Sequence, residues 1–424
     1  MTRLDYPALG EVIFDSVLPN GLRIITVRKK GFRKAFAMYA TRYGGADRRF
    51  QLDGEWIDTP WGVAHYLEHK LFDMPEDNNA LADLSARGAD PNAFTSNGMT
   101  AYHVTCTDDF YENLRSLLTF VSTPYFTPES VAKEQGIIGQ EILMGENAPG
   151  YVAYFELMKA LYAHHPVRDN EAGTLESIAQ ITPEILYHCH KVFYHPSNMV
   201  LVCVCDADPE QIAAIAGEVL PSEPGAVPVR DYGEPETPFP LERRVEKAMA
   251  VSAPLAYMGI KLTPAKDGKA LLRQQLTAEL ALDYLIGPSS ALYAELYDKG
   301  LLGRDFGTDV DSSAGTLTVL LGGESKDPDA VMAALTDRVG LIARRGIDPA
   351  SFERCRRAGY GRALDRLDRF YSYACMLSQG AFDGWGVGDL FELLKEITPE
   401  EAADFLCEAV TPDRLALSVV RPER

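Results

Sequence analysis

The sequence lacks the features that mark membrane, secreted and disulfide-rich proteins. No apolar run approaches the ~20 residues that a membrane-spanning helix needs, and the opening MTRLDYPALGEVIFDS has no basic segment followed by an apolar one. Its seven cysteines are an odd number without a CxxC pair, unlike a disulfide framework. We therefore expect a protein of the cytoplasm that has no membrane partner.

Positive charge is also scarce. The chain has 41 Lys and Arg against 61 Asp and Glu, a formal net charge of −20 at pH 7. This balance disfavours nucleic acid and anionic membranes as partners, and it favours a neutral or cationic ligand. The motifs GxxxxGK[ST], GxGxxG and GxSxG are absent as well, which argues against phosphate binding, dinucleotide binding and serine-hydrolase chemistry.

An internal repeat divides the chain near its middle. ITPEILYHCHKVFYHPSNMVLVCV (181–204) and ITPEEAADFLCEAVTPDRLALSVV (397–420) match in register from ITPE to a final apolar strand. FTPESVAKEQGIIGQEILMG (126–145) and IDPASFERCRRAGYGRALDR (347–366) form a second pair, each with a capping residue before proline at the first helical position. Two similar halves are therefore predicted.

Proline marks the boundary between these halves. Six prolines between 221 and 240 predict an extended linker at 221–244, because neither a helix nor a central strand tolerates that density. The first domain is then 1–220 and the second 245–424. Short strand candidates interleaved with helices of ten or more residues predict an α+β fold in each half.

Histidine is rare, yet the stretch 61-WGVAHYLEHKLF-72 holds two of the eight histidines, and none lies after position 195. On a helix, His65 and His69 lie about 40° apart around the axis, with Glu68 on the same face. Two imidazoles one turn apart fit a zinc ion, and a carboxylate between them can take a proton from water. The alternative interpretation is that these are ordinary histidines of an amphipathic helix.

A catalytic zinc site usually has a third protein ligand. The helix predicted from Pro128 offers Glu134 and Glu141 on one stripe, and its Gly136 and Gly139 suggest that another helix approaches closely. A solvated acidic face with incidental glycines remains the alternative. In the second half, Glu279, Leu282 and Asp283 align with the histidine motif, and Arg362 aligns with Glu141, so that copy lacks the ligand set.

The motif HxxEH is the inverted zinc motif of inverzincins. With four further motifs in order, the chain resembles the M16 (pitrilysin, insulinase) metallopeptidases, and most closely the HxxEH-bearing member of paired bacterial M16B-type peptidases. These motifs are NGL (20–22), GADPNAFTSNGMTAY (88–102), EQGIIGQEI (134–142) and HPVRDNEAGTLESIAQITPEIL (165–186). The resemblance covers nearly the whole chain. It implies two similar α+β domains, each an antiparallel-rich sheet packed against helices, in the LuxS-like metallohydrolase architecture.

The resemblance also assigns roles to individual residues. It implies a zinc ion held by three ligands, a base that activates water, an upstream glutamate that supports the site, and an edge strand to which a peptide adds. The zinc ligands would be His65, His69 and Glu141, and the base would be Glu68. Glu134 would be the supporting glutamate, and the edge strand would carry Asn92, Ala93 and Thr95.

One departure concerns the second domain, where the family usually places an arginine and, seven residues later, a tyrosine that bind substrate. Here Tyr297 and Arg304 occupy these positions in exchanged order. We therefore expect a zinc endopeptidase that cleaves short or unfolded peptides and is paired with a homologous subunit lacking HxxEH, or forms a homodimer. The alternatives are a non-catalytic peptide-binding or scaffold subunit, and a chain that is active only with its partner.

Overall fold

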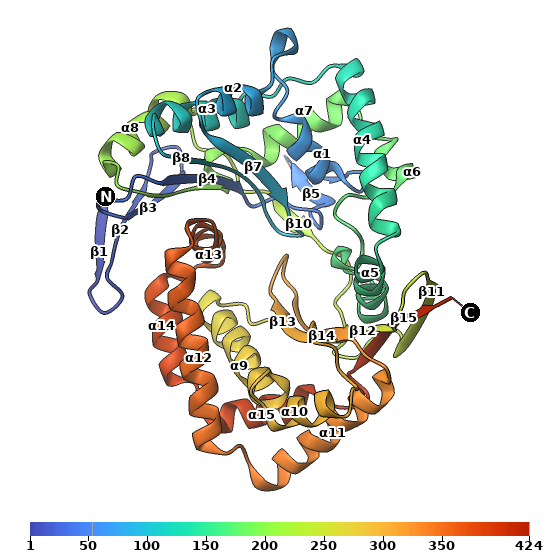
Figure 1. The fold of residues 1–424 in the computed structure, drawn as a ribbon. Coiled ribbons are helices and arrows are strands. Elements are labelled where there is room, and N and C mark those ends of the chain that lie inside the picture. Colours follow the sequence, from blue (N-terminus) through green and yellow to red (C-terminus); the bar gives the residue numbers. More distant parts are fainter. Residues whose placement is uncertain (53, 424) are drawn as a thin grey trace. The chain divides into compact units, whose positions relative to one another are not determined.

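The computed structural model describes residues 1–52 and 54–423. These residues form two compact units, and neither is a continuous stretch of chain (Figure 1). The first unit comprises Met1–Ile142, Asn170–Tyr232 and Leu364–Gly386, and the second comprises Leu143–Asp169, Gly233–Ala363 and Val387–Arg424.

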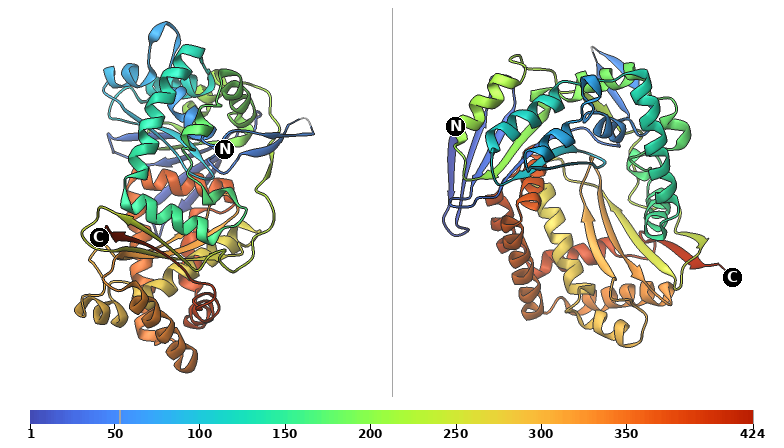
Figure 2. Two further views of the ribbon diagram at one scale, coloured as in Figure 1. Left: turned by 90° about the vertical axis from the view of Figure 1, so that its right-hand side faces the viewer. Right: turned by 45° about the horizontal axis from the view of Figure 1, so that its top comes forward.

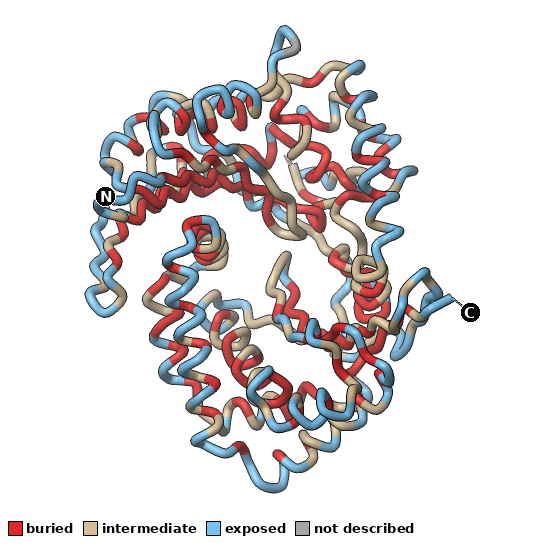
Figure 3. Tube along the Cα trace, in the orientation of Figure 1, coloured by how far each residue is buried: buried red, intermediate tan, exposed pale blue. Residues whose placement is uncertain are grey.

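A seven-stranded sheet forms the centre of the first unit, and only its β3–β9 pair is parallel. In spatial order its strands are β1 (Thr2–Tyr6), β2 (Glu11–Val17), β3 (Arg23–Arg28), β9 (Met199–Cys205), β4 (Ala35–Thr41), β8 (Thr100–Cys106) and β7 (Asp90–Thr95). Strands β4 and β9 are buried along their whole length, as Figure 3 shows. Their near-continuous apolar sequences follow from burial on both faces, as expected for central strands.

A small second sheet in the first unit has the order β10 (Val229–Asp231), β5 (Arg49–Leu52) and β6 (Glu55–Asp58). The predicted linker at 221–244 therefore contains a strand that pairs with the first half of the chain. The helices of this unit are α1 (Val63–Lys70), α2 (Ala80–Ala86), α3 (Phe110–Ser122), α4 (Pro128–Glu146, to Ile142), α6 (Leu175–Ile178), α7 (Pro183–Phe193), α8 (Pro209–Val219) and α13 (Phe370–Asp383), with 3₁₀ turns at Pro75–Asp77 and Pro196–Asn198.

The second unit has a five-stranded sheet in the order β11 (Arg244–Met249), β15 (Ala416–Pro422), β12 (Leu255–Leu262), β14 (Leu317–Glu324) and β13 (Gly307–Asp311). Only β11 and β15 are parallel. Its helices are α5 (Pro149–Leu161), α9 (Gly268–Ile286), α10 (Ala291–Asp298), α11 (Pro328–Arg345), α12 (Pro349–Asp368, to Ala363), α14 (Val387–Glu396) and α15 (Pro399–Ala409), with a 3₁₀ turn at Pro166–Arg168.

The repeat predicted from the sequence appears in both sheets. The strands β3-β9-β4-β8-β7 and β11-β15-β12-β14-β13 have the same order, and in each only the first pair is parallel. The two ITPE motifs begin α7 and α15, where Thr182 and Thr398 cap the helices and proline follows. The predicted fold of two similar α+β domains, each with an antiparallel-rich sheet packed against helices, is confirmed.

The units differ from the predicted division at 221–244 because each sheet takes a helix from the other half of the sequence. Helix α13 packs on β9 and β4 of the first unit, and α5 packs on β12 and β15 of the second (Figures 1 and 2). A sheet that is buried on both faces needs helices on both. Among the described residues, no helix is both long and apolar enough to cross a membrane.

Candidate metal centre

Helix α1 carries the histidine motif and is held by contacts at its start and in its middle. It begins after Gly62, whose φ of 92° lies in the left-handed region that favours glycine. A Cβ at this position would lie 2.5 Å from the Ala172 carbonyl oxygen. Leu67 of this helix is fully buried in the core. The Tyr66 hydroxyl donates a hydrogen bond to the Val131 carbonyl of α4, which ties the two helices that supply the site.

Both histidines and Glu141 direct one ligand atom to a common point. Glu141 Oε2 lies 3.7 Å from His65 Nε2 and 3.6 Å from His69 Nε2. A tetrahedral zinc ion with bonds of ~2.1 Å would separate its ligand atoms by about 3.4 Å, so these spacings fit the ion closely. In the described part of the chain, no other three His, Cys, Asp or Glu residues lie close enough together to hold a metal ion. Zinc would be held by His65, His69 and Glu141.

The environment keeps one imidazole ready to bind metal. Burial, followed by the neighbouring His69, lowers the pKa of His65 to about 3, so its ring is neutral at physiological pH. Neutral imidazole is the form that binds metal ions. For His69, burial lowers the pKa, but the hydrogen bond to Glu134 and the nearby carboxylates outweigh it and raise the pKa.

Glu134 lies behind the ligands and makes a hydrogen bond that orients one of them. His69 Nδ1 donates to Glu134 Oε1 at 2.9 Å, which leaves Nε2 facing Glu141. The carboxylate side chain is only 14% exposed, compared with 53% for Glu141. This carboxylate–histidine arrangement is typical of metal sites, where the outer carboxylate fixes the ring and its tautomer.

Glu68 forms a hydrogen bond with the sheet and lies close enough to His69 and Glu141 for their charges to act on its carboxylate. Thr95 Oγ1 on β7 donates to Glu68 Oε2 at 2.7 Å. Burial raises the pKa of Glu68, while the Thr95 hydrogen bond opposes this increase. A carboxylate with a raised pKa is a better proton acceptor near neutral pH. The bond between Thr95 and Glu68 could not be found from spacing, because it joins two elements 27 residues apart.

The predicted substrate strand is β7, which ends the sheet and pairs on one side with β8 among the described residues. Asn92 is exposed, and its Oδ1 accepts from the Ala93 N–H at 2.9 Å. Thr95 lies at the end of the strand beside Glu68. Whether Asn92, Ala93 and Thr95 contact a peptide stays a prediction.

The glycines of α4 differ from the expectation of close helix packing. A Cβ at Gly139 would meet Leu175 of α6 at 3.4 Å, whereas a Cβ at Gly136 would meet nothing within 4 Å. Gly136 is exposed, so no described helix packs against it. The contact between α4 and α1 is made by the Tyr66 hydrogen bond to Val131 and not through the glycines.

In the second unit, the aligned positions carry an ion pair in place of the ligands. Arg362 donates to the carboxylate of Asp283, and these residues align with Glu141 and His69. A guanidinium at this place would repel a divalent cation, in agreement with the predicted loss of the ligand set from this half.

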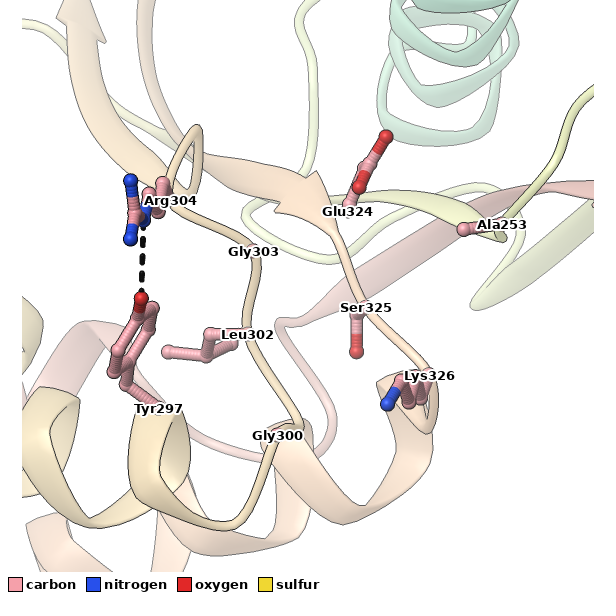
Figure 4. Close-up of a pocket in the computed structure, with 9 residues that line it drawn as sticks. All are labelled: Ala253, Tyr297, Gly300, Leu302, Gly303, Arg304, Glu324, Ser325 and Lys326. Carbon is pink, nitrogen blue, oxygen red and sulfur yellow. Dashed lines mark hydrogen bonds between the residues drawn. The ribbon is translucent and has the colours of Figure 1, made fainter.

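Tyr297 and Arg304 lie together despite their exchanged order. Arg304 Nε donates to the Tyr297 hydroxyl at 3.1 Å, and both residues line a cavity of about 410 Å³ (Figure 4). The buried Ser325 lines the same cavity, and its hydroxyl has no hydrogen-bond partner among the described residues.

Comparisons with known proteins agree with the two-domain fold and with a possible metal site at His65, His69 and Glu141. Residues 57–174 match the family described as insulinase (peptidase family M16), and residues 180–358 match the peptidase M16 inactive domain. The uncharacterized zinc protease YmfH of Bacillus subtilis is 36% identical over 99% of both chains. The chain belongs to peptidase family M16.

Solved structures place the whole chain in the same fold. An M16-like peptidase from Alicyclobacillus acidocaldarius is 35% identical, with a TM-score of 0.92 over 100% of both chains. Pitrilysin is 18% identical and shares the fold, with a TM-score of 0.76. The match covers 97% of this chain and 45% of the pitrilysin chain.

Proposed function

We propose that this chain is a zinc-dependent endopeptidase that cleaves short or unfolded polypeptides, with Glu68 as the general base. The convergence of His65, His69 and Glu141 within ligand spacing carries this proposal. Bound at such a site, zinc lowers the pKa of water and polarises a carbonyl group. The family names and the relatives called zinc proteases support the same chemistry.

The residues of the chain supply the remaining parts of the mechanism. Thr95 holds one oxygen of Glu68 by a hydrogen bond, so the side chain keeps one orientation. Glu68 accepts a proton from the attacking water and then transfers it to the amine that leaves. An extended peptide added to β7 would lie beside Glu68, because Thr95 is the last residue of that strand.

The test is Glu68→Gln, which keeps the size of the side chain but removes its basicity. We expect one zinc ion per chain in both proteins, measured by elemental analysis, and at least a 100-fold loss of cleavage of a peptide library. Glu112→Gln, at an exposed position of α3, is the matched control and retains activity. Full activity in the Glu68 variant would exclude the assigned base.

A homologous partner is a second part of the proposal. The exchange of Tyr297 and Arg304 suggests that another M16 subunit, without HxxEH, supplies the usual pair. Cleavage that rises at least tenfold when the two chains are mixed supports the pairing. Zinc-free protein that binds peptides without cleaving them, alone or mixed, favours a scaffold subunit instead.

A further inference from the structure

Strand β1 is the outer strand at one end of the seven-stranded sheet. Among the described residues it pairs only with β2, in an unbroken antiparallel register from Thr2 opposite Asp15 to Tyr6 opposite Glu11. Figure 1 shows it as the last strand at its end of the first unit. Every residue from Met1 to Asp5 is exposed. The outer edge of β1 is therefore a template to which one more strand can add.

This edge lacks the backbone devices that usually prevent strand addition. The sequence TRLDY contains no proline, and its five consecutive pairs with β2 leave no bulge. Charged side chains also discourage pairing at an edge, but the two charges of β1, Arg3 and Asp5, have opposite signs. They form an exposed ion pair at 2.8 Å within the strand. Such a pattern selects a partner strand of matching charge order and does not repel all strands alike.

The surface beside β1 is apolar and hollowed. Leu4 is 37% exposed, and Met1 and Val17 are 55% and 65% exposed. All three line a groove with a volume of about 450 Å³. Thr2 and Leu4 lie on one face of the sheet, together with Asp15, because Asp15 is opposite Thr2 in the register. Exposed apolar side chains gathered at an open strand edge are typical of a protein contact surface.

The sequence of β1 is complementary to itself in one antiparallel register. When two copies of a strand pair around a two-fold axis, one residue lies opposite its own copy, and the central candidates are Arg3, Leu4 and Asp5. Centring on Arg3 or Asp5 puts like charges directly opposite each other, which is destabilising. Centring on Leu4 puts each Arg3 opposite Asp5 of the other copy and pairs all five residues.

We propose that β1 is an interface at which a second copy of this chain pairs antiparallel around Leu4, which joins two seven-stranded sheets into one. Tyr6 of the second copy then lies opposite Thr2, on the face of the groove, and covers its apolar side chains. The inference is independent of the proposed peptidase function. It leaves the substrate strand free, because β7 ends the same sheet on the opposite side.

The experiment is sedimentation velocity of the full chain, with no tag at its N-terminus, in about 0.15 M salt, which screens the net charge of −20. The contact is small, so we expect a weak dimer whose dissociation shows between about 1 and 100 µM protein. Arg3→Asp and Asp5→Arg each place like charges opposite one another and should raise the dissociation constant at least tenfold. An equimolar mixture of these two variants should associate again, because unlike charges then face each other at both positions.

The matched controls are Arg33→Asp and Asp108→Arg, which make the same charge changes at another exposed ion pair of the first unit. Each should keep the dissociation constant within twofold. The double variant with both Arg3→Asp and Asp5→Arg should dimerise like the unchanged chain, and thermal midpoints check that every variant folds. A chain that stays monomeric over the whole range, a dimer that the single changes leave intact, or a mixture that stays monomeric overturns the inference.

A cysteine cross-link tests the register. Residues directly opposite each other have Cβ atoms about 4.5–5.5 Å apart, close to the separation that a disulfide spans. Leu4→Cys should therefore give a covalent dimer on mild oxidation, seen by non-reducing electrophoresis. Val17→Cys, at a more exposed position on β2, should remain monomeric. A chain that dimerises without cross-linking through position 4 overturns the pairing around Leu4. None of these measurements requires cleavage, so failure of the peptidase proposal would not affect them.

Discussion

At the scale of single residues, Glu134 determines how His69 presents its ring to the metal. The carboxylate accepts from Nδ1 at 2.9 Å and is largely buried, so it selects the tautomer with a free Nε2. Glu134→Ala should weaken zinc binding 10- to 100-fold, the range usual for such outer carboxylates. Competition with a fluorescent chelator measures the change.

The control for this prediction is Glu129→Ala, an exposed glutamate in the first turn of the same helix. Its zinc affinity should equal that of the unchanged protein. Equal affinities in all three proteins would mean that Glu134 does not orient the ligand.

The sequence could predict those site residues whose geometry is set within one helix. The spacing of His65, Glu68 and His69 places them on one face whatever the tertiary fold, and the seven-residue spacing of Glu134 and Glu141 does the same. Contacts between separate elements carry no such signal. The hydrogen bond from Thr95 to Glu68 depends on elements that meet only in the folded chain.

At the scale of elements, two glycines should respond in opposite ways to alanine. Gly62→Ala forces a side chain into a φ of 92° and against Ala172, which should cost about 1–3 kcal/mol and weaken zinc binding at the start of α1. Gly136→Ala adds a methyl group in open space on α4, and should stabilise the protein by up to ~1 kcal/mol. Urea unfolding measures both changes.

These two variants also test the helix packing at the site. If Gly136→Ala destabilised the protein or reduced its zinc affinity, another element would have to lie against that face of α4. If Gly62→Ala were neutral, the loop at Ala172 would have to move freely, in contrast to its tight contact with Gly62.

The segment predicted as a linker is held in place by Glu236. Its carboxylate accepts from the N–H groups of Ala163, His164 and His165, and it forms an ion pair with the buried Lys261 at 2.6 Å. Burial raises the pKa of Glu236, but these hydrogen bonds outweigh it and lower the pKa to about 2. Proline density predicted an extended chain here, but no sequence pattern indicated this anchor.

Glu236 should therefore make stability depend on pH in the acid range. Its folded pKa lies below the ordinary value of 4.5, so its contribution is present above pH ~4.5 and is lost as pH falls towards 2. Glu236→Gln should lower the unfolding free energy at pH 7 by on the order of 1–2 kcal/mol and flatten its decline between pH 4.5 and 2. Denaturation curves at several pH values measure this.

The exposed Glu234 provides the comparison, since Glu234→Gln leaves the anchor intact and should keep both the stability and its pH profile. A Glu236 variant with the same acid profile as the unchanged protein would contradict the proposed linkage.

At the scale of the whole molecule, the repeat predicted two similar halves but not their exchange of helices. Helices α5 and α13 each bury one set of side chains, but nothing in their sequences indicates which sheet they pack against. The sheet faces decide this: Phe36 and Met38 of β4 are fully buried because Tyr371 and Ser378 of α13 lie against them. Which helix packs on which sheet is decided only in the folded chain, so no local pattern in the sequence predicts it.

This exchange predicts that the fragment 1–220 cannot fold as an independent zinc domain. Without α13, the apolar face of β4 and β9 is open to water, and each large side chain uncovered there costs about 1.5–3 kcal/mol. A few such losses offset the 5–15 kcal/mol that stabilises a typical domain. We expect the isolated fragment to bind a hydrophobic dye and to unfold without a cooperative transition, whereas co-expression with 221–424 restores both the transition and zinc binding. A cooperative, zinc-binding fragment 1–220 would show that α13 contributes little to the sheet that carries the metal centre.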